Sequence, residues 1–288
     1  MIKVQKSKKI TWYIAQKYQM GRGNWKAFPK DDLSKLYKAT KEWKEALAGV
    51  DKPWLCWCMD DEWCYVQQKL IEAIGWTPVI GTDGRVTKPT LLKNSILIDF
   101  NKYFNYPIVT MQFPLEFVFL FTNKLAFWHS DVLPPLRIMK KISSKFNNIK
   151  RGEYMGIRIR PPYSERWFEV LGCTTKAASQ SQFDYGCGIW RYITHHPNFN
   201  KKVITNPFYD HGTGIFFWET KFKGKAKELG IDINPYHYSI TSKEGYIRKW
   251  INSRYMAKSK YDELKINFKL SEIVKEIGLT KNVRENKE

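Results

Sequence analysis

The middle of the chain alternates between short apolar runs and stretches with helical spacing. Residues 54–58, 77–80 and 95–100 are apolar runs of the length of a strand. Between the first two, apolar side chains recur every three or four positions from Trp63 to Ile74, after an aspartate pair and before a glycine. Short apolar runs are typical of buried strands, and this spacing is typical of an amphipathic helix. Strand, helix and strand in this order predict a parallel, doubly wound sheet.

The same alternation continues further along the chain. Residues 124–128 form another apolar run, and a helix with apolar positions on one face follows from Ile138 to Phe146. Residues 154–160 alternate as a strand does, and the apolar run 214–218 predicts one more strand. We therefore expect an α/β fold with a mostly parallel open sheet flanked by helices.

The two ends of the chain are more basic than its middle. Residues 1–50 end in a predicted helix, and residues 244–288 contain two more helical patterns. We divide the chain into a basic entry segment packed on the core (1–50), an α/β catalytic domain (51–243) and a basic helical C-terminal extension (244–288).

The formal net charge is +20 and the isoelectric point is about 9.6. Such a field attracts nucleic acid, anionic membranes or nucleotide phosphates, although lysine-rich surfaces also simply keep proteins soluble. The strongest local signal is a predicted helix near Trp250, where basic and aromatic residues interleave. This pattern suits a nucleic-acid backbone with unstacked bases, an anionic membrane surface, or a solvated helix whose aromatic side packs inward. The candidate polyanion-binding residues are Arg248, Lys249, Arg254 and Lys258.

Two features bear on where the protein works. The basic N-terminus is not followed by an apolar segment, and the longest apolar stretch, residues 113–128, is interrupted by Glu116 and Lys124. Neither pattern predicts a secretory signal or a transmembrane span. The five cysteines are odd in number and lack the paired spacing of a zinc site, which favours a reducing compartment. We expect a cytoplasmic protein.

Polar residues follow the apolar run 124–128 at once. Ligands of open α/β sheets bind beyond the carboxyl ends of the strands, which is where His129, Ser130 and Asp131 are expected. A carboxylate with an imidazole suits Mn²⁺, and such an ion would neutralise a nucleotide diphosphate leaving group. The alternative is that Asp131 caps the next turn.

An apolar strand that ends in His-Ser-Asp resembles the DxD motif of GT-A glycosyltransferases, with His129 in the place of the first acidic residue. The resemblance covers the order of elements over residues 52–240. It implies a Rossmann-related fold in which Asp131 binds Mn²⁺ or Mg²⁺ on the diphosphate of a nucleotide sugar. It also implies that a histidine near the end of the catalytic domain, His237, completes the metal site.

By the same resemblance, the first strands hold the base and ribose of the donor. A carboxylate at a strand end can accept hydrogen bonds from either, and it can equally be a cap or a turn residue. Lys176, in a segment of small residues, could pair with phosphate or belong to a loop at a helix entry. The candidate donor-binding residues are Asp60, Asp61, Asp83, Asp99 and Lys176.

In an inverting transfer a carboxylate deprotonates the acceptor hydroxyl, and the candidates are Asp184, Asp210 and Glu219. The expected function is therefore sugar transfer to a hydroxyl acceptor, such as a nucleic acid with a hydroxylated base or a cell-envelope glycan. Two alternatives stay open. One is a non-catalytic nucleic-acid-binding protein, and the other is a metal-dependent nuclease that uses the aspartates at the strand ends.

Overall fold

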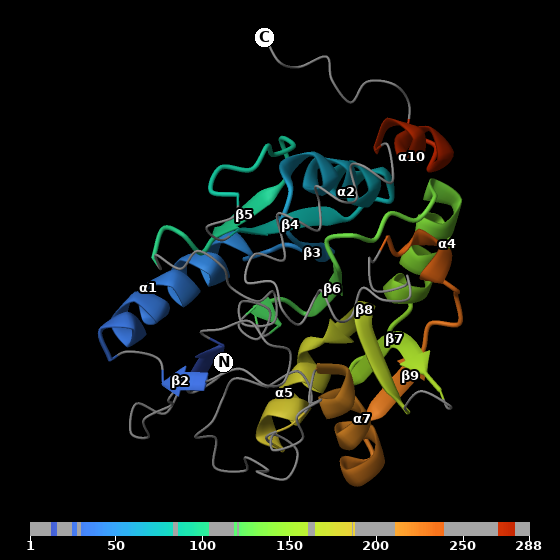
Figure 1. Cartoon of the computed structure of the whole chain (residues 1–288). Coiled ribbons are helices and arrows are strands. Elements are labelled where there is room, and N and C mark those ends of the chain that lie inside the picture. The colour runs from blue at the N-terminus through green and yellow to red at the C-terminus, as the bar shows by residue number, and fades with distance from the viewer. Residues whose placement is uncertain are drawn as a thin grey trace.

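The computed structural model describes residues 13–15, 25–27, 30–82, 86–103, 118–119, 121–160, 165–185, 187, 211–238 and 270–279. These residues form a seven-stranded sheet with helices on both faces, and a separate two-stranded ribbon (Figure 1). The ribbon pairs β1 (Tyr13–Ala15) with β2 (Trp25–Ala27) in antiparallel register.

The large sheet is mixed but mostly parallel. Its spatial order is β5-β4-β3-β6-β8-β7-β9, and β8 alone runs against the other strands. The strands are β3 (Pro53–Trp57), β4 (Thr77–Thr82), β5 (Ile96–Asp99), β6 (Lys124–Trp128), β7 (Glu153–Ile159), β8 (Arg166–Thr175) and β9 (Lys225–Glu228). The expectation of an α/β fold with a mostly parallel sheet is confirmed.

The first strand–helix–strand unit forms as its sequence pattern predicts. The carboxylate of Asp60 accepts a hydrogen bond from the backbone N of Trp63 at 3.2 Å, which caps helix α2 (Asp61–Ala73). Gly75 then takes a φ of +72°, a left-handed conformation that glycine adopts without steric cost, and the chain turns into β4. Strands β3 and β4 pair in parallel from Pro53 to Trp57.

The order of the strands creates a switch point between β3 and β6. From β3 the chain moves to β4 and β5 on one side, and β6 is then added on the other side of β3. In doubly wound sheets the connections diverge at such a point, and they leave a crevice outside the carboxyl ends of the two strands. The residues that follow β3 and β6 therefore face each other at this edge of the sheet. The Ser130 hydroxyl lies 3.0 Å from the sulfur of Met59 there.

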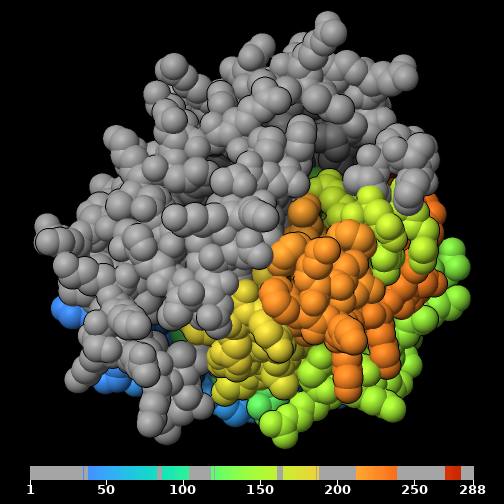
Figure 2. Space-filling model, turned by 90° about the horizontal axis from the view of Figure 1, so that it is seen from below, coloured from blue at the N-terminus to red at the C-terminus, as the bar shows by residue number. Residues whose placement is uncertain are grey.

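Among the described residues, three helices pack on each face of the sheet (Figure 1). Buried side chains of α1 (Lys30–Ala46), α5 (Lys176–Asp184) and α7 (His211–Phe222) share one core cluster with Trp57 and Phe127. Those of α2, α4 (Leu136–Asn147) and α10 (Leu270–Glu276) share a second cluster with Trp54 and Trp128. Figure 2 shows α5 and α7 packed side by side, and the indole N–H of Trp218 donates to the hydroxyl of Ser181 across them.

One predicted strand is wrong, because residues 214–218 belong to helix α7. A short, uninterrupted apolar run looks the same in a buried strand and in a buried helix, so its periodicity could not separate them. In the folded chain Ile215 and Trp218, three positions apart, are both buried, as one face of a helix requires. Glu219 therefore lies within a helix and not at the end of a strand.

The terminal segments contribute to the core where they are described. Ala39, Trp43 and Leu47 of the entry segment are buried, and so are Ile273 and Ile277 near the C-terminus. The backbone N of Leu136 donates to Ile277 O at 2.9 Å, which joins the start of α4 to the end of α10. Among the described residues, no helix combines the length and the apolar character that crossing a bilayer demands.

Candidate metal centre at the end of β6

His129, Ser130 and Asp131 leave the sheet at the carboxyl end of β6. The backbone N of His129 still donates to Val170 O of β8 at 2.8 Å, so the first residue of the motif continues the ladder. The chain then turns, with the backbone N of Val132 donating to His129 O at 3.3 Å. This turn places Asp131 in the interior of the protein, where the residue is only 1% exposed.

A distant segment returns to this turn through the backbone. The short 3-10 helix η1 (Asn234–Tyr236) precedes His237, which forms an isolated antiparallel bridge with Val132. The backbone N of Leu133 donates to Tyr236 O at 3.0 Å, and that of Tyr238 donates to Asp131 O at 2.9 Å. Backbone contacts on both sides of His237 thus hold its ring against the motif.

The three side chains converge. Nε2 of His237 lies 3.3 Å from Oδ1 of Asp131, and the ring centroids of His129 and His237 are 5.7 Å apart. One ligand atom from each of the three residues lies within 4.8 Å of the others. The ring of Phe168 lies 6.3 Å from that of His129 and 5.7 Å from that of His237, so the centre has an apolar wall.

This donor set fits a divalent ion. Neighbouring ligand atoms that bind one ion at about 2.0–2.2 Å lie about 3.0–3.6 Å from each other, so the 3.3 Å between Asp131 and His237 already fits one ion. Two imidazoles and one carboxylate suit Mn²⁺, Zn²⁺ or Fe²⁺ and are less suited to Mg²⁺, which prefers oxygen. Within the described part of the chain, no other group of three His, Cys, Asp or Glu side chains is arranged in this way.

Gln67, which the sequence did not single out, holds the turn after β6 through two hydrogen bonds. Its fully buried side chain lies on α2, and its Nε2 donates to His129 O at 2.8 Å and to Val132 O at 3.0 Å. The carbonyls at the start and the end of this turn, those of His129 and Val132, are thereby tied to a helix of the core. The only sequence signal was a glutamine at a position of α2 where the helical pattern calls for an apolar residue.

The candidate donor-binding carboxylates lie at the same edge of the sheet, with partners of their own. Asp60 caps α2, and Asp61 accepts from the backbone N of Thr90 at 2.6 Å and from its hydroxyl at 2.7 Å. Asp99, at the end of β5, accepts from the backbone N of Lys102 at 3.2 Å and from the hydroxyl of Thr82 at 3.3 Å. These are the cap and turn contacts that the sequence allowed as the alternative, and binding of a donor by these residues stays a prediction.

Lys176 lies at the opposite edge of the sheet. Thr175 pairs with Lys124 at the start of β6, whereas Leu171 pairs with Trp128 at its end. At a rise of about 3.3 Å per residue, the length of β6 separates Lys176 from the histidine–aspartate centre. Lys176 instead begins α5, with its backbone N donating to Asn123 O at 2.8 Å. It is therefore not part of the site around Asp131.

The candidate bases are placed differently from one another. Asp184 is exposed at the end of α5 and accepts from the side chain of Gln180 at 2.9 Å. Glu219 accepts from Arg158 at 3.0 Å and from the indole N–H of Trp167 at 2.9 Å. The described residues do not include Asp83 or Asp210, nor the polyanion-binding candidates Arg248, Lys249, Arg254 and Lys258.

Comparisons with protein-family models, with curated proteins and with solved structures found no match for this chain.

Proposed function

We propose that the protein transfers a sugar from a nucleotide-sugar donor to a hydroxyl acceptor, with a divalent ion held by His129, Asp131 and His237. The convergence of Asp131 and His237 carries this proposal. The resemblance to GT-A glycosyltransferases implied that these two residues, far apart in the sequence, share one ion. Their side chains lie 3.3 Å apart in the fold.

The position of the centre supports a nucleotide ligand. His129 and Asp131 follow β6, one of the two strands at the switch point of the sheet. Doubly wound sheets bind nucleotides in the crevice outside the strand ends at that point. The doubly wound order and the single antiparallel strand are compatible with a GT-A-like arrangement. Thr82 and Asp99, at the ends of the neighbouring strands β4 and β5, offer a hydroxyl and a carboxylate at the same edge.

The chemistry required of the residues follows from the bonds that change. The bond between the sugar carbon and the diphosphate oxygen breaks, a bond to the acceptor oxygen forms, and the acceptor proton passes to a carboxylate. The bound ion would supply neutralisation of the negative charge on the departing diphosphate. Asp131 and the two imidazoles would hold that ion, and the ring of Phe168 would restrict water on one side of the centre.

Glu219 is a candidate base held by two partners. Arg158 lies near the carboxyl end of β7, and Trp167 lies near the start of β8, on the face of the sheet opposite to Phe168. Both strand ends are at the edge of the sheet where His129 emerges. Release from Arg158 would be needed before this carboxylate could accept a proton. Asp184 and Asp210 stay proposed as alternatives.

The same donor set favours a second candidate function, that of a non-haem iron oxygenase. Two histidines and one carboxylate also hold ferrous iron in non-haem oxygenases. The location at a switch point is the observation that favours a nucleotide-bearing substrate instead. The choice of ion therefore separates the two chemistries, and the test includes both ions.

The test is thermal unfolding with a panel of nucleotide sugars, each with Mn²⁺, Mg²⁺ or Fe²⁺ or without added metal. A ligand that binds only the folded protein at 100 times its Kd stabilises it by about 2.7 kcal/mol. We expect one donor to raise Tm in the presence of Mn²⁺ and to lose this effect in Asp131→Asn. Asp51→Asn, an exposed carboxylate elsewhere, is the matched control. If no nucleotide sugar shifts Tm with any ion, the transferase proposal fails.

A further inference from the structure

The outward face of α4 is basic and has no acidic residue. Its apolar positions, among them Met139, Ile142 and Phe146, are buried against the sheet. The residues that point to solvent carry positive charge or neutral hydrogen-bonding groups, and the helix contains no acidic residue. The exposed basic residues of α4 and of the turn after it are Arg137, Lys140, Lys141, Lys145, Lys150 and Arg151. We call this set the α4 basic face.

The charges on this face are ordered in rows. Arg137, Lys141 and Lys145 recur every four positions, so they lie along one row with steps of about 6 Å and a length of about 12 Å. Lys140, Ser144 and Asn148 form the neighbouring row at the same spacing. A single nucleic-acid strand carries one phosphate per about 3.4 Å of helix axis, so the first row spans about three to four phosphates.

Two of the described carboxylates lie near the face: Asp232 lines a hollow together with Lys141 and Lys145, and Glu153 accepts from the backbone N of Lys150. Within the described part of the chain, none of Arg137, Lys140, Lys141 and Lys145 forms an ion pair. Glu153, close to Lys150 in the sequence, is engaged by Lys227 at 2.7 Å. The basic side chains of the α4 basic face therefore outnumber the carboxylates described near them.

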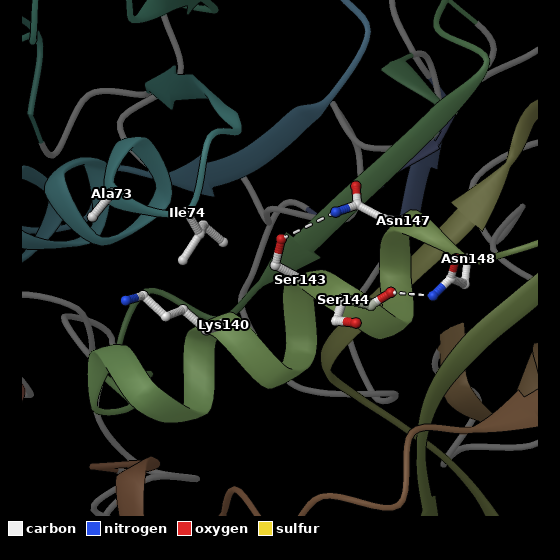
Figure 3. A pocket seen from close by; sticks show the side chains of 7 residues that line it. All are labelled: Ala73, Ile74, Lys140, Ser143, Ser144, Asn147 and Asn148. Atoms are coloured by element: carbon white, nitrogen blue, oxygen red, sulfur yellow. Dashed lines mark hydrogen bonds between the residues drawn. The ribbon is translucent and has the colours of Figure 1, made fainter.

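A hollow lies on either side of α4. One, of about 380 Å³, lies between α4 and the end of α2 and is lined by Ala73, Ile74, Lys140, Ser143, Ser144, Asn147 and Asn148 (Figure 3). The other, of about 540 Å³, is lined by Lys141 and Lys145 of α4, together with Gly230, Ile231 and Asp232. Lysine, serine and asparagine side chains are the usual donors to phosphate oxygens in nucleic-acid complexes.

The chemistry of the face favours nucleic acid over a membrane. Helices that bind at a membrane interface bury a face with Trp, Phe or Leu in the lipid. The apolar face of α4 is already buried in the core, and the large apolar side chains that are exposed among the described residues, Leu91 and Tyr185, lie on other elements. The exposed surface of α4 therefore presents positive charges and hydrogen-bond donors between two hollows.

We propose that the α4 basic face binds the phosphodiester backbone of a nucleic acid without sequence preference. Phosphate contacts from Lys and Arg fix the position of a protein on nucleic acid and carry no sequence information themselves. The binding surface goes beyond the proposed transferase activity and does not depend on the metal centre. If both hold, the nucleic acid is the polyanion that presents the acceptor.

The test is fluorescence anisotropy with labelled DNA duplexes and single strands of about 20 nucleotides, from about 50 to about 200 mM salt. The variant Arg137→Gln/Lys141→Gln/Lys145→Gln removes the first row of the α4 basic face. Because each lost phosphate contact lowers the salt dependence of log K by about 1, we expect the slope to fall by about 3. Affinity at the lowest salt should drop at least about tenfold.

The matched control removes three exposed lysines from α1, in the variant Lys38→Gln/Lys41→Gln/Lys44→Gln. This control lowers the net charge of the protein by the same amount as the α4 variant. An equal loss of affinity in both variants would show that the overall positive charge of the protein, and not the α4 basic face, attracts the nucleic acid, and it would overturn the proposal. Binding of phosphatidylserine vesicles through α4, with no binding of DNA or RNA, would overturn it in favour of lipid headgroups. Asp131→Asn should bind DNA as the wild type does, which separates this outcome from failure of the proposed transferase.

Discussion

Oδ1 of Asp131 lies 3.3 Å from Nε2 of His237, and the backbone of the next residue, Val132, bridges to His237. Side-chain and backbone contacts therefore bring the same two segments together. The two segments would stay together even if one of these side chains changed its rotamer, because the backbone N–H of Tyr238 also donates to Asp131 O. The fold by itself thus brings these candidate ligands together, and the first prediction follows from this.

We predict that Mn²⁺ binds the protein in the absence of any nucleotide. In His237→Gln and Asp131→Asn the Kd for Mn²⁺ should rise about 100-fold, because each variant loses one of three ligands, and this factor corresponds to about 2.7 kcal/mol. Titration calorimetry with Mn²⁺ measures the change. Asp51→Asn should bind as the wild type does, and an unchanged Kd in both site variants would remove the ion from these residues.

The second prediction uses two adjacent glutamines of α2. Gln67→Met removes the hydrogen bonds to His129 O and Val132 O and should lower the free energy of unfolding by about 1–3 kcal/mol. Because those bonds hold the loop that carries the ligands, Mn²⁺ affinity should also fall about 10–100-fold. Chemical denaturation and calorimetry measure the two effects separately.

Gln68→Met is the matched control for this prediction. Gln68 is equally buried, but its amide bonds to Thr90 O and its carbonyl oxygen accepts from the backbone N of Leu92 and the hydroxyl of Ser95. Its loss should destabilise the protein by a similar amount and leave the Kd for Mn²⁺ unchanged. Equal effects of both variants on metal binding would show that Gln67 acts through general stability alone.

A third prediction concerns pH and the carboxylate of Glu153. Burial would raise the pKa of Glu153, but hydrogen bonds from Lys227 Nζ and the backbone N of Lys150 outweigh it and hold this pKa below its usual value. A depressed folded-state pKa adds stability above the unfolded value of about 4.3 and loses it as the pH falls through the folded value. Glu153→Gln should therefore cost about 1–2 kcal/mol near neutral pH.

The difference between wild type and Glu153→Gln should shrink as the pH falls below about 4. Urea denaturation at a series of pH values measures it. Glu228→Gln, which breaks an exposed pair with Arg160, should cost at most about 0.5 kcal/mol at any pH. A cost for Glu153→Gln that stays constant at low pH would contradict the assignment.

The fourth prediction is that the cysteines are unreactive in the folded protein. All five are free and buried. Burial raises the pKa of the Cys187 thiol to about 12, and it also raises the pKa of Cys56 and Cys173. The thiolate is the reactive form, so a disulfide reagent at about pH 8 should label the cysteines only after denaturant is added. Rapid labelling of any cysteine in the native protein would contradict the burial.

Local patterns were enough to predict the elements that build the site. The spacing of apolar residues indicated α2 and α4, the apolar run 124–128 indicated β6, and the acidic residue before α2 indicated its cap. Each of these depends on neighbours within a few positions, which a sequence displays directly. The polar residues after β6 also marked the candidate site, because ligands of open α/β sheets bind beyond the carboxyl ends of the strands.

Other features depend on contacts between distant segments, which local periodicity does not encode. Residues 214–218 were predicted as a strand and form part of α7, because the faces of a short apolar run are decided by what it packs against. The buried role of Gln67 was invisible for the same reason, since its partners lie on another segment.

The sequence by itself determined the types of the main elements and the motif His129-Ser130-Asp131. Resemblance, and not spacing, pointed to His237. Only the tertiary structure decided that His237 meets Asp131 and that Lys176 does not, because the order of strands and the backbone bridge at Val132 set those distances. Chain-distant ligands are brought to one point by sheet topology, and a topology is the sum of pairings that no single segment specifies.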